Sequence, residues 1–292
     1  FNHQIVELYS RDLGVPQARL GYIRHHPLQD VLDEIRHLLT TYRNIRMFIF
    51  DDDLFTFNRD YVVEFCRRYP RISDRPFVVN AHVQVFDPEV ARSLKQAGCA
   101  IVKFGIESGS ERVRREVMRR TMKNETIRQA LAVAEDAGLH SSAFVMIGLP
   151  TETRDEVLET VQLLADTRPG RFRWTAFFPF PHTVAWELSR AGGFIDTAKM
   201  GSLSNFTDDS CLDFGPEHNL WLAKMLKTFP WQVNARSGLA CAPRYQELVR
   251  DIEGMTDAQW HAAAAAIRQR DADESRAQDA AGALHYAIRF NP

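Results

Sequence analysis

Residues 101–111, IVKFGIESGSE, and residues 144–153, FVMIGLPTET, are the two stretches that decide the fold. Each is an apolar run that ends in a short turn of small and polar residues and leads into a segment of helical periodicity. A (β/α) barrel builds its working face in this way, because its chemistry lies at strand ends and in the loops after them. We therefore expect two strands whose carboxyl ends open into one cavity.

The rest of the first 190 residues repeats this pattern. Apolar runs predict strands at 45–50, 76–83, 100–106, 142–148 and 172–178. Helical periodicity lies between them, at about 27–42, 58–69, 87–97, 110–118, 124–137 and 153–166. Such alternation predicts parallel strands with right-handed crossovers.

Local signals mark the helix boundaries. Asp87 precedes Pro88 at a helix start, and Gly98 and Gly138 stand where helices end before a strand. Ser108 to Glu111 and Thr153 to Glu156 have the spacing of a capping box.

Five strand–helix units do not close an eight-stranded barrel. We expect an α/β fold in which residues 1–190 form a partial (β/α)6-type, TIM-like barrel whose first strand lies upstream of Phe1. After about residue 190 the alternation stops, and residues 191–292 are predicted to be a loop followed by a helical C-terminal extension. The expected segments are a loop at 192–216 and helices at 217–229, 243–252 and 256–269.

Composition excludes several classes. A net charge of −2 and a pI near 6.6 argue against a nucleic-acid-binding surface. No apolar run reaches the roughly 18 residues of a membrane span. The cysteines Cys66, Cys99, Cys211 and Cys241 are too far apart for a metal motif, which predicts separate reduced thiols in a cytoplasmic protein.

The turns at the two strand ends carry the first candidate site. Glu107 would project into the barrel mouth and accept hydrogen bonds from a diol such as a ribose, while Ser108 helps the chain turn. Gly148 would leave bare backbone for a flat ring. The alternatives are that Ser108 is only a cap, that Glu107 is a solvated charge, and that the second turn is an ordinary strand-to-helix loop.

Polar residues at other strand ends are further candidates. Three acids at 51–53, in FDDDLFT, could hold a cation or an ammonium group, or could complement a helix dipole. Asn80, His82 and Gln84 alternate along one predicted strand, so they would share a polar face toward a ligand or toward water. His182, after the last strand, is a substrate-side candidate or a solvent-exposed loop residue.

Taken together, the segments DDDLFT, KQAGCAIVKFGIESGSERV, MKNETIRQALAVAEDAGL, FVMIGLPTET and FFPFPHT resemble the radical S-adenosylmethionine (SAM) superfamily. The resemblance covers about residues 1–190, and FDDDLFT and MKNE are most similar to the branch with an upstream cobalamin-binding domain. It implies an enzyme that uses a [4Fe–4S] cluster to cleave SAM reductively, with cobalamin-dependent methyl transfer as the leading activity. It also implies a small-molecule substrate and an electron donor such as flavodoxin or ferredoxin.

The family's cluster is held by a CxxxCxxC loop, which this sequence lacks. FNHQIVELY resembles the segment just after the third of those cysteines, so the ligands are expected upstream of Phe1 and the chain as given is expected to be inactive.

The resemblance assigns roles to single residues. Asp52 and Asp53 would meet the SAM amino group, Glu107 and Ser108 the ribose, and Ile147 and Gly148 the adenine. Asn80, His82 and His182 are substrate-side candidates. The sequence departs from the family at three positions: His82 replaces a common arginine, Arg119 a frequent asparagine, and His182 a glycine.

Two other hypotheses about the function remain open. One is a cobalamin-independent radical SAM enzyme, such as a methylthiotransferase or an oxidoreductase. The other is a cluster-less barrel that serves as a binding module. Upstream sequence would separate them, because a CxxxCxxC motif eliminates the binding module and a doubly wound domain favours cobalamin.

Overall fold

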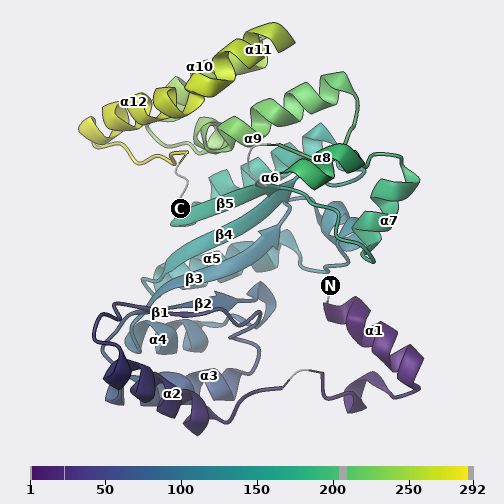
Figure 1. Ribbon diagram of the computed structural model, residues 1–292. Coiled ribbons are helices and arrows are strands. Elements are labelled where there is room, and N and C mark those ends of the chain that lie inside the picture. Colours follow the sequence, from purple (N-terminus) through teal and green to yellow (C-terminus); the bar gives the residue numbers. More distant parts are fainter. Residues whose placement is uncertain (1, 23, 204–208, 289–292) are drawn as a thin grey trace.

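The centre of the molecule is a five-stranded sheet, shown in the computed structural model of Figure 1, which describes residues 2–22, 24–203 and 209–288. All neighbouring strands are parallel, in the order β1-β2-β3-β4-β5. The strands are β1 (Phe48–Phe50), β2 (Phe77–Ala81), β3 (Cys99–Glu107), β4 (His140–Ile147) and β5 (Arg171–Ala176). Every predicted strand is present, which confirms the α/β class and the strand–helix alternation.

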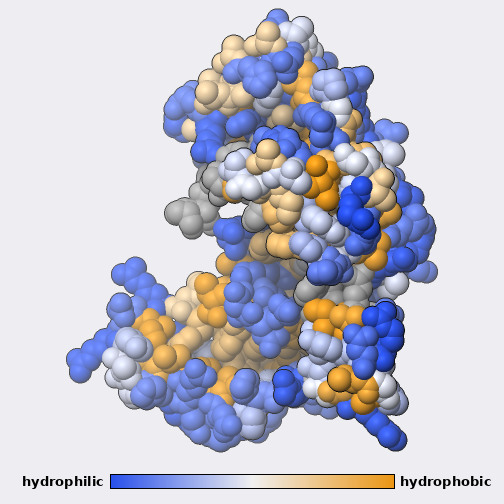
Figure 2. Space-filling model, turned by 45° about the vertical axis from the view of Figure 1, so that its right-hand side comes forward, coloured by the Kyte–Doolittle hydropathy of each residue, from blue (hydrophilic) through white to orange (hydrophobic). Residues whose placement is uncertain are grey.

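Helices join these strands in sequence order. They are α3 (Arg59–Arg68), α4 (Pro88–Gln96), α5 (Asn124–Asp136) and α6 (Arg154–Thr167), and α1 (Asn2–Leu13) and α2 (Leu28–Thr41) precede β1. Burial alternates along the strands because one face packs on these helices: on β3, Val102, Phe104 and Ile106 are fully buried, whereas Lys103 and Glu107 are not. We call the face that carries Lys103 and Glu107 the inner face. Figure 2 shows the molecule hollowed between its lower part and the upper part that holds the C-terminal helices.

Most of the predicted helix boundaries are confirmed. The Asp87 carboxylate accepts the N–H groups of Glu89 and Val90, and Thr153 and Glu156 form a complete capping box. Gly98 and Gly138 both have positive φ, at 93° and 68°; Gly98 directly precedes β3, and Gly138 stands two residues before the first residue of β4. These residues fix where each helix ends and the next strand begins.

The predicted capping box at Ser108 is wrong. The Ser108 hydroxyl accepts the N–H of Ser110, and Ser110 in turn accepts the N–H of Val113. Glu111 accepts instead the N–H of Asn124, at 2.7 Å. The segment that follows is a single π-helical turn, η4 (Val113–Val117), in place of the α-helix expected at 110–118.

The C-terminal part begins with α7 (Val184–Ala191) and a short α8 (Thr197–Ser202), which lies inside the predicted loop; residues 204–208 of that loop lie outside the described residues. The remaining helices are α9 (Pro216–Arg236), α10 (Ala242–Glu253), α11 (Asp257–Ala263) and α12 (Ile267–Ala280). They confirm a helical extension.

This extension shares its core with the barrel. Phe172 and Trp174 of β5 pack on Phe229 of α9, and the Trp174 indole donates to the Leu226 carbonyl at 2.6 Å. One cluster of buried side chains runs from Leu32 in α2 into α12. A division at residue 190 therefore stays a prediction from sequence, without a matching break in the packing.

Candidate active site

A cavity of about 530 Å³ opens at the carboxyl ends of β3, β4 and β5. Its walls are mainly apolar, and the charged side chains in its lining are Glu107 and Arg120. The lining residues are Glu107, Val117, Met118, Arg120, Met146, Phe177, Phe178, Phe180, Pro181, Thr183, Val184 and Ala185. Barrel strand ends, π-turn η4 and α7 thus enclose one mouth, which is where ligands bind in α/β barrels.

Glu107 is the last residue of β3 and has an unusual backbone. Its φ is 70°, and the register between β3 and β4 shifts between Gly105 and Glu107. Its carboxylate lies 3.1 Å from the guanidinium of Arg120, and its side chain is 15% exposed. A Cβ on Gly105 would lie 2.5 Å from the Glu107 carboxylate, so the glycine leaves the space that this carboxylate fills.

Burial and the neighbouring Arg120 have opposite effects on the pKa of the Glu107 carboxyl. Burial raises the pKa of the Glu107 carboxyl above its usual range, and the positive charge of Arg120 opposes that shift. Arg120 therefore favours the ionised form, which accepts hydrogen bonds and donates none. A carboxylate in an apolar mouth is suited to bind a diol or an amine.

Ser108 does not line this cavity. It is fully buried, and its hydroxyl lies 3.4 Å from the Glu152 carboxylate and 3.4 Å from the Thr160 hydroxyl. Its carbonyl accepts a hydrogen bond from the buried Arg114. The structure thus gives Ser108 an internal structural role in joining the two turns.

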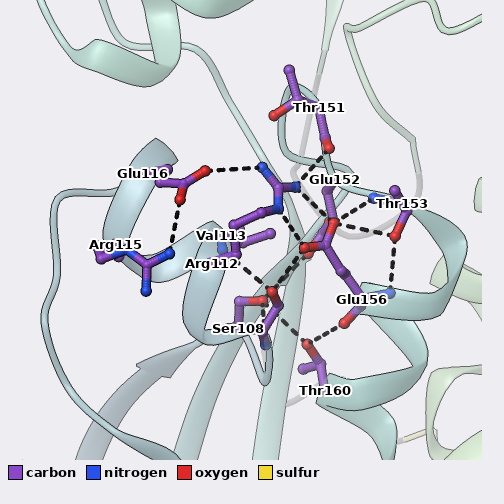
Figure 3. A network of polar contacts seen from close by, with 11 residues as sticks. Ser108, Arg112, Val113, Arg115, Glu116, Thr151, Glu152, Thr153, Glu156 and Thr160 are labelled. Carbon is purple, nitrogen blue, oxygen red and sulfur yellow. Dashed lines mark hydrogen bonds and ion pairs between the residues drawn. The ribbon is translucent and has the colours of Figure 1, made fainter.

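A buried network holds the two turns together (Figure 3). Glu152 accepts the N–H groups of Gly148 and Leu149, at 2.8 and 3.1 Å, and its other oxygen faces Ser108. Burial raises the pKa of Glu152 to about 8, although the two N–H groups oppose the rise. One side chain therefore connects the end of β4 to the turn after β3.

The neighbouring Glu156 is bound from the same turn. Arg112 donates to both of its oxygens at 2.7 Å, and the Ser110 hydroxyl donates at 2.9 Å. The paired Arg112 lowers the pKa of Glu156 to about 2. With Glu152, this ion pair fixes the loop after β3 against the start of α6.

The end of β4 presents a different residue to the cavity than expected. Ile147 is fully buried on the helix-covered face, and Met146, its neighbour on the inner face, lines the cavity. Gly148 has a φ of 77°, and a Cβ there would lie 2.8 Å from Leu222 of α9. The side of Gly148 that lacks a Cβ, which was expected to face a flat ring, is thus covered by the Leu222 side chain.

Asp51, Asp52 and Asp53 are exposed after β1, outside the cavity lining. Asp52 caps its own turn by accepting the N–H of Leu54, and its carbonyl accepts the Asn80 side-chain amide at 2.9 Å. Lys103 lies 4.0 Å from Asp51. Asp52 and Asp53 are therefore accessible from the solvent side, with one Asp52 oxygen already bound to the Leu54 N–H.

The predicted polar face on the second strand is wrong beyond Asn80. β2 ends at Ala81, and the following 3₁₀ turn Val83–Val85 begins at His82, whose ring accepts the N–H of Gln84. Burial, and then the charge of Arg120, lower the pKa of His82. Gln84 is exposed, so it does not share a strand face with Asn80.

His182 and Arg119 lie outside the cavity as well. His182 has a φ of 67° and lines a second hollow of about 600 Å³ with Pro181 and α1. Arg119, with a φ of 56°, is exposed. Of the residues predicted from sequence, Glu107 alone lines the cavity at the strand ends.

Sequence reasoning missed Arg120, Met146 and Phe177 in this lining. Alternation along β4 could have placed Met146 opposite Ile147, because successive strand residues point to opposite faces. Arg120 follows the π-turn, whose extra residue per turn has no clear signal in the sequence. Its place beside Glu107 could not be read from spacing.

The sequence profile of the Radical SAM superfamily matches residues 9–164. The chain belongs to this superfamily, whose members use SAM and a [4Fe–4S] cluster.

Two curated relatives are methyltransferases. An uncharacterized methyltransferase of Pyrococcus horikoshii is 30% identical over 175 residues, which are 60% of this chain and 38% of the relative. Cytidylyl-2-hydroxyethylphosphonate methyltransferase of Streptomyces wedmorensis is 28% identical over 236 residues, 77% of this chain and 43% of the relative. The chain thus spans about two fifths of the length of these relatives.

Solved structures agree with the fold. The radical SAM methyltransferase TsrM of Kitasatospora setae, with cobalamin and a [4Fe–4S] cluster bound, matches with a TM-score of 0.52 at 18% identity, over 59% of this chain and 35% of that one. The cobalamin-dependent radical enzyme OxsB, with SAM and aqua-cobalamin bound, matches with a TM-score of 0.53 at 11% identity, over 77% and 41%. At these identities the likeness supports the partial barrel and its helices.

The residues present fit SAM better than they fit the cluster. Within the described ranges no three His, Cys, Asp or Glu side chains gather to hold a metal ion, and all four cysteines are free and buried. These thiols do not fit cluster ligation. In contrast, the Glu107 carboxyl at the edge of an apolar cavity fits a nucleoside, which has a diol and a flat ring.

Proposed function

We propose that this chain is the SAM-binding barrel of a radical SAM methyltransferase of the cobalamin-dependent type. The observation that carries the proposal is Glu107, a paired carboxylate in an otherwise apolar cavity at adjoining strand ends. The methyltransferase relatives support the reaction class, and the two cobalamin-bound structures support the branch.

The roles of the residues follow from their places. Glu107 would accept hydrogen bonds from the ribose hydroxyls, and Arg120 would hold its carboxylate ionised and oriented. Met146 and the phenyl rings after β5 would cover the adenine and exclude water. Ile147 and Gly148 would act through backbone groups, and Ser108 would position the turn that carries Glu107.

The cluster, when bound, supplies the electron that cleaves SAM in this superfamily. We propose that its ligands are the cysteines of a CxxxCxxC motif, because the four cysteines of this chain do not gather within the described residues. Asp52 and Asp53 would meet the SAM amino group from the exposed end of β1, and Asn80, His82 and His182 would be on the substrate side.

The proposal extends to partners and location. An electron donor such as flavodoxin or ferredoxin would serve the cluster, in the cytoplasm, and the substrate would be a small molecule. None of the described helices has both the length and the apolar character of a membrane span. The barrel at 1–190 and the extension at 191–292 would act as one unit, since their cores are shared.

Binding of S-adenosylhomocysteine tests the proposal without the cluster. Calorimetry should show saturable binding to the protein, weakened at least tenfold by Glu107→Gln, because a neutral amide loses the charge-assisted bonds to the diol. Glu125→Gln, an exposed glutamate at the start of α5, is the control and should bind unchanged. Equal affinity in both variants, or no binding to the parent protein, would refute the nucleoside site.

A cobalamin-independent methylthiotransferase is the second candidate. A putative methylthiotransferase of Methanocaldococcus jannaschii is 24% identical over 181 residues, 60% of this chain and 40% of the relative. Cobalamin titration of the full-length, anaerobically reconstituted protein separates the candidates by its visible spectrum. Failure to form an iron–sulfur chromophore would instead favour a binding module.

A further inference from the structure

A row of polar side chains crosses the inner face of the sheet below the cavity. Parallel pairing places Asn80 of β2 beside Lys103 of β3, Lys103 beside Ser142 of β4, and Ser142 beside Arg171 of β5. Arg173 stands one step higher on β5, beside Phe144. Two guanidinium groups, an ammonium group, a hydroxyl and an amide thus share one surface.

These side chains face away from the helices. On β5, Phe172 and Trp174 pack on α9, so Arg171 and Arg173, which alternate with them along the strand, point to the opposite face. The Arg171 guanidinium reaches across to β4 and donates to the Ser142 hydroxyl at 3.0 Å. That bond confirms the orientation and holds Arg171 over the sheet.

The positive charge of the row has little compensation. Among the described residues, the Arg173 side chain has no hydrogen bond or ion pair, and the single hydrogen bond of the Arg171 side chain goes to a neutral hydroxyl. Burial, and then the charge of Arg173, lower the pKa of Arg171, so the two guanidinium groups repel each other. Lys103 is 4.0 Å from Asp51, which is 84% exposed and therefore a weak partner.

There is room for a ligand beside the arginines. Arg171 and Arg173 line a hollow of about 420 Å³ along β5 and residues 283–287, together with His140. The carboxylate in that lining, Asp279, lies 4.0 Å from His285. Two adjacent cations without an acid between them are stabilised when an oxyanion binds both, because Arg forms paired, charge-assisted bonds with such groups.

We propose that Arg171 and Arg173 form an anion subsite for a phosphate or phosphonate group of the substrate, with Lys103 on the same face of the sheet but outside the hollow. The inference rests on the proposed function, since it places this group relative to the nucleoside. Lys103 precedes Glu107 by four residues on β3, which at about 3.3 Å per residue puts the Lys103 backbone roughly 13 Å from that of Glu107, and the arginines lie two strands to the side. A substrate would span that distance, with its anionic end on the row and its reacting end toward the strand ends.

The test is calorimetric titration of the protein with methylphosphonate, at low and at high salt. We expect saturable binding that weakens with salt and that falls roughly tenfold in Arg173→Gln. The Arg173 side chain has no hydrogen bond to lose among the described residues, so its replacement should leave the melting temperature unchanged. Arg92→Gln, on the exposed side of α4, is the control and should bind like the parent.

The same variants titrated with S-adenosylhomocysteine separate this inference from the proposed function. Unchanged nucleoside affinity in Arg173→Gln, with phosphonate binding reduced, supports a separate substrate subsite. Loss of nucleoside affinity there would overturn it, because the arginine would then hold the SAM carboxylate. Phosphonate binding without nucleoside binding would keep the subsite and refute the proposed function; absent or unaltered phosphonate binding refutes the subsite.

Discussion

Glu152 should make the free energy of unfolding fall as the pH rises, and Glu152→Gln should remove that dependence. The carboxyl is buried, and its pKa is raised from 4.5 to about 8. The folded protein therefore retains a proton that the unfolded chain releases above pH 4.5. The loss of unfolding free energy that results is absent below pH 4.5, grows up to about pH 8, and is constant at higher pH.

The magnitude follows from this interval. The rise from 4.5 to about 8, at about 1.4 kcal/mol per pKa unit, corresponds to ~5 kcal/mol as the full effect. A glutamine fits the site, since its carbonyl can accept the N–H groups of Gly148 and Leu149 and its amide can donate to Ser108.

Urea denaturation at pH 5 to 9 is the assay. Glu152→Gln should match the parent near pH 5 and exceed it by several kcal/mol above pH 8, while Glu125→Gln follows the parent throughout. A Glu152→Gln protein that is less stable than the parent at pH 9 would refute the reasoning. It would mean that the two backbone donors stabilise the ionised carboxylate more than burial penalises it.

Three further predictions concern the stability of the fold and the burial of a thiol. Glu156→Gln should lower the free energy of unfolding by about 2 kcal/mol at pH 7, because the paired Arg112 stabilises the ionised carboxylate and lowers its pKa to about 2. The difference should vanish toward pH 2, since protonation of Glu156 removes that stabilisation. Gly148→Ala should cost about 2 kcal/mol in chemical denaturation, more than Gly193→Ala, since both have positive φ but only the first Cβ would meet Leu222. Burial raises the pKa of Cys66 to about 12, so its reaction with a thiol reagent should be slow at pH 8 and become rapid in denaturant.

The strands and most helices could be predicted from sequence because their signals are local. Asp87, Thr153 and Gly138 act on the neighbouring backbone, and each is found at a helix boundary. Apolar runs likewise indicate strands that are buried against helices, and this signal does not depend on distant segments of the chain. The parallel order then follows from the alternation.

The site was less predictable because it depends on contacts between distant segments. Glu107 was placed correctly at a strand end, yet its partner Arg120 follows a π-turn that shifts the register of the helix. Ser108 looked like a cap for Glu111, but its hydroxyl reaches Glu152, 44 residues later. Such long-range pairs leave no periodic trace in the sequence.

Leu222 has a consequence for how this chain can be recombined with its relatives. It comes from the C-terminal extension, yet it closes the back of the strand end at Gly148. A chimera that imports another protein's tail would therefore change the packing behind the end of β4, even with every barrel residue retained. Exchange of the tail should alter the stability of the barrel as well, because the buried core is shared, so the two parts must be exchanged together.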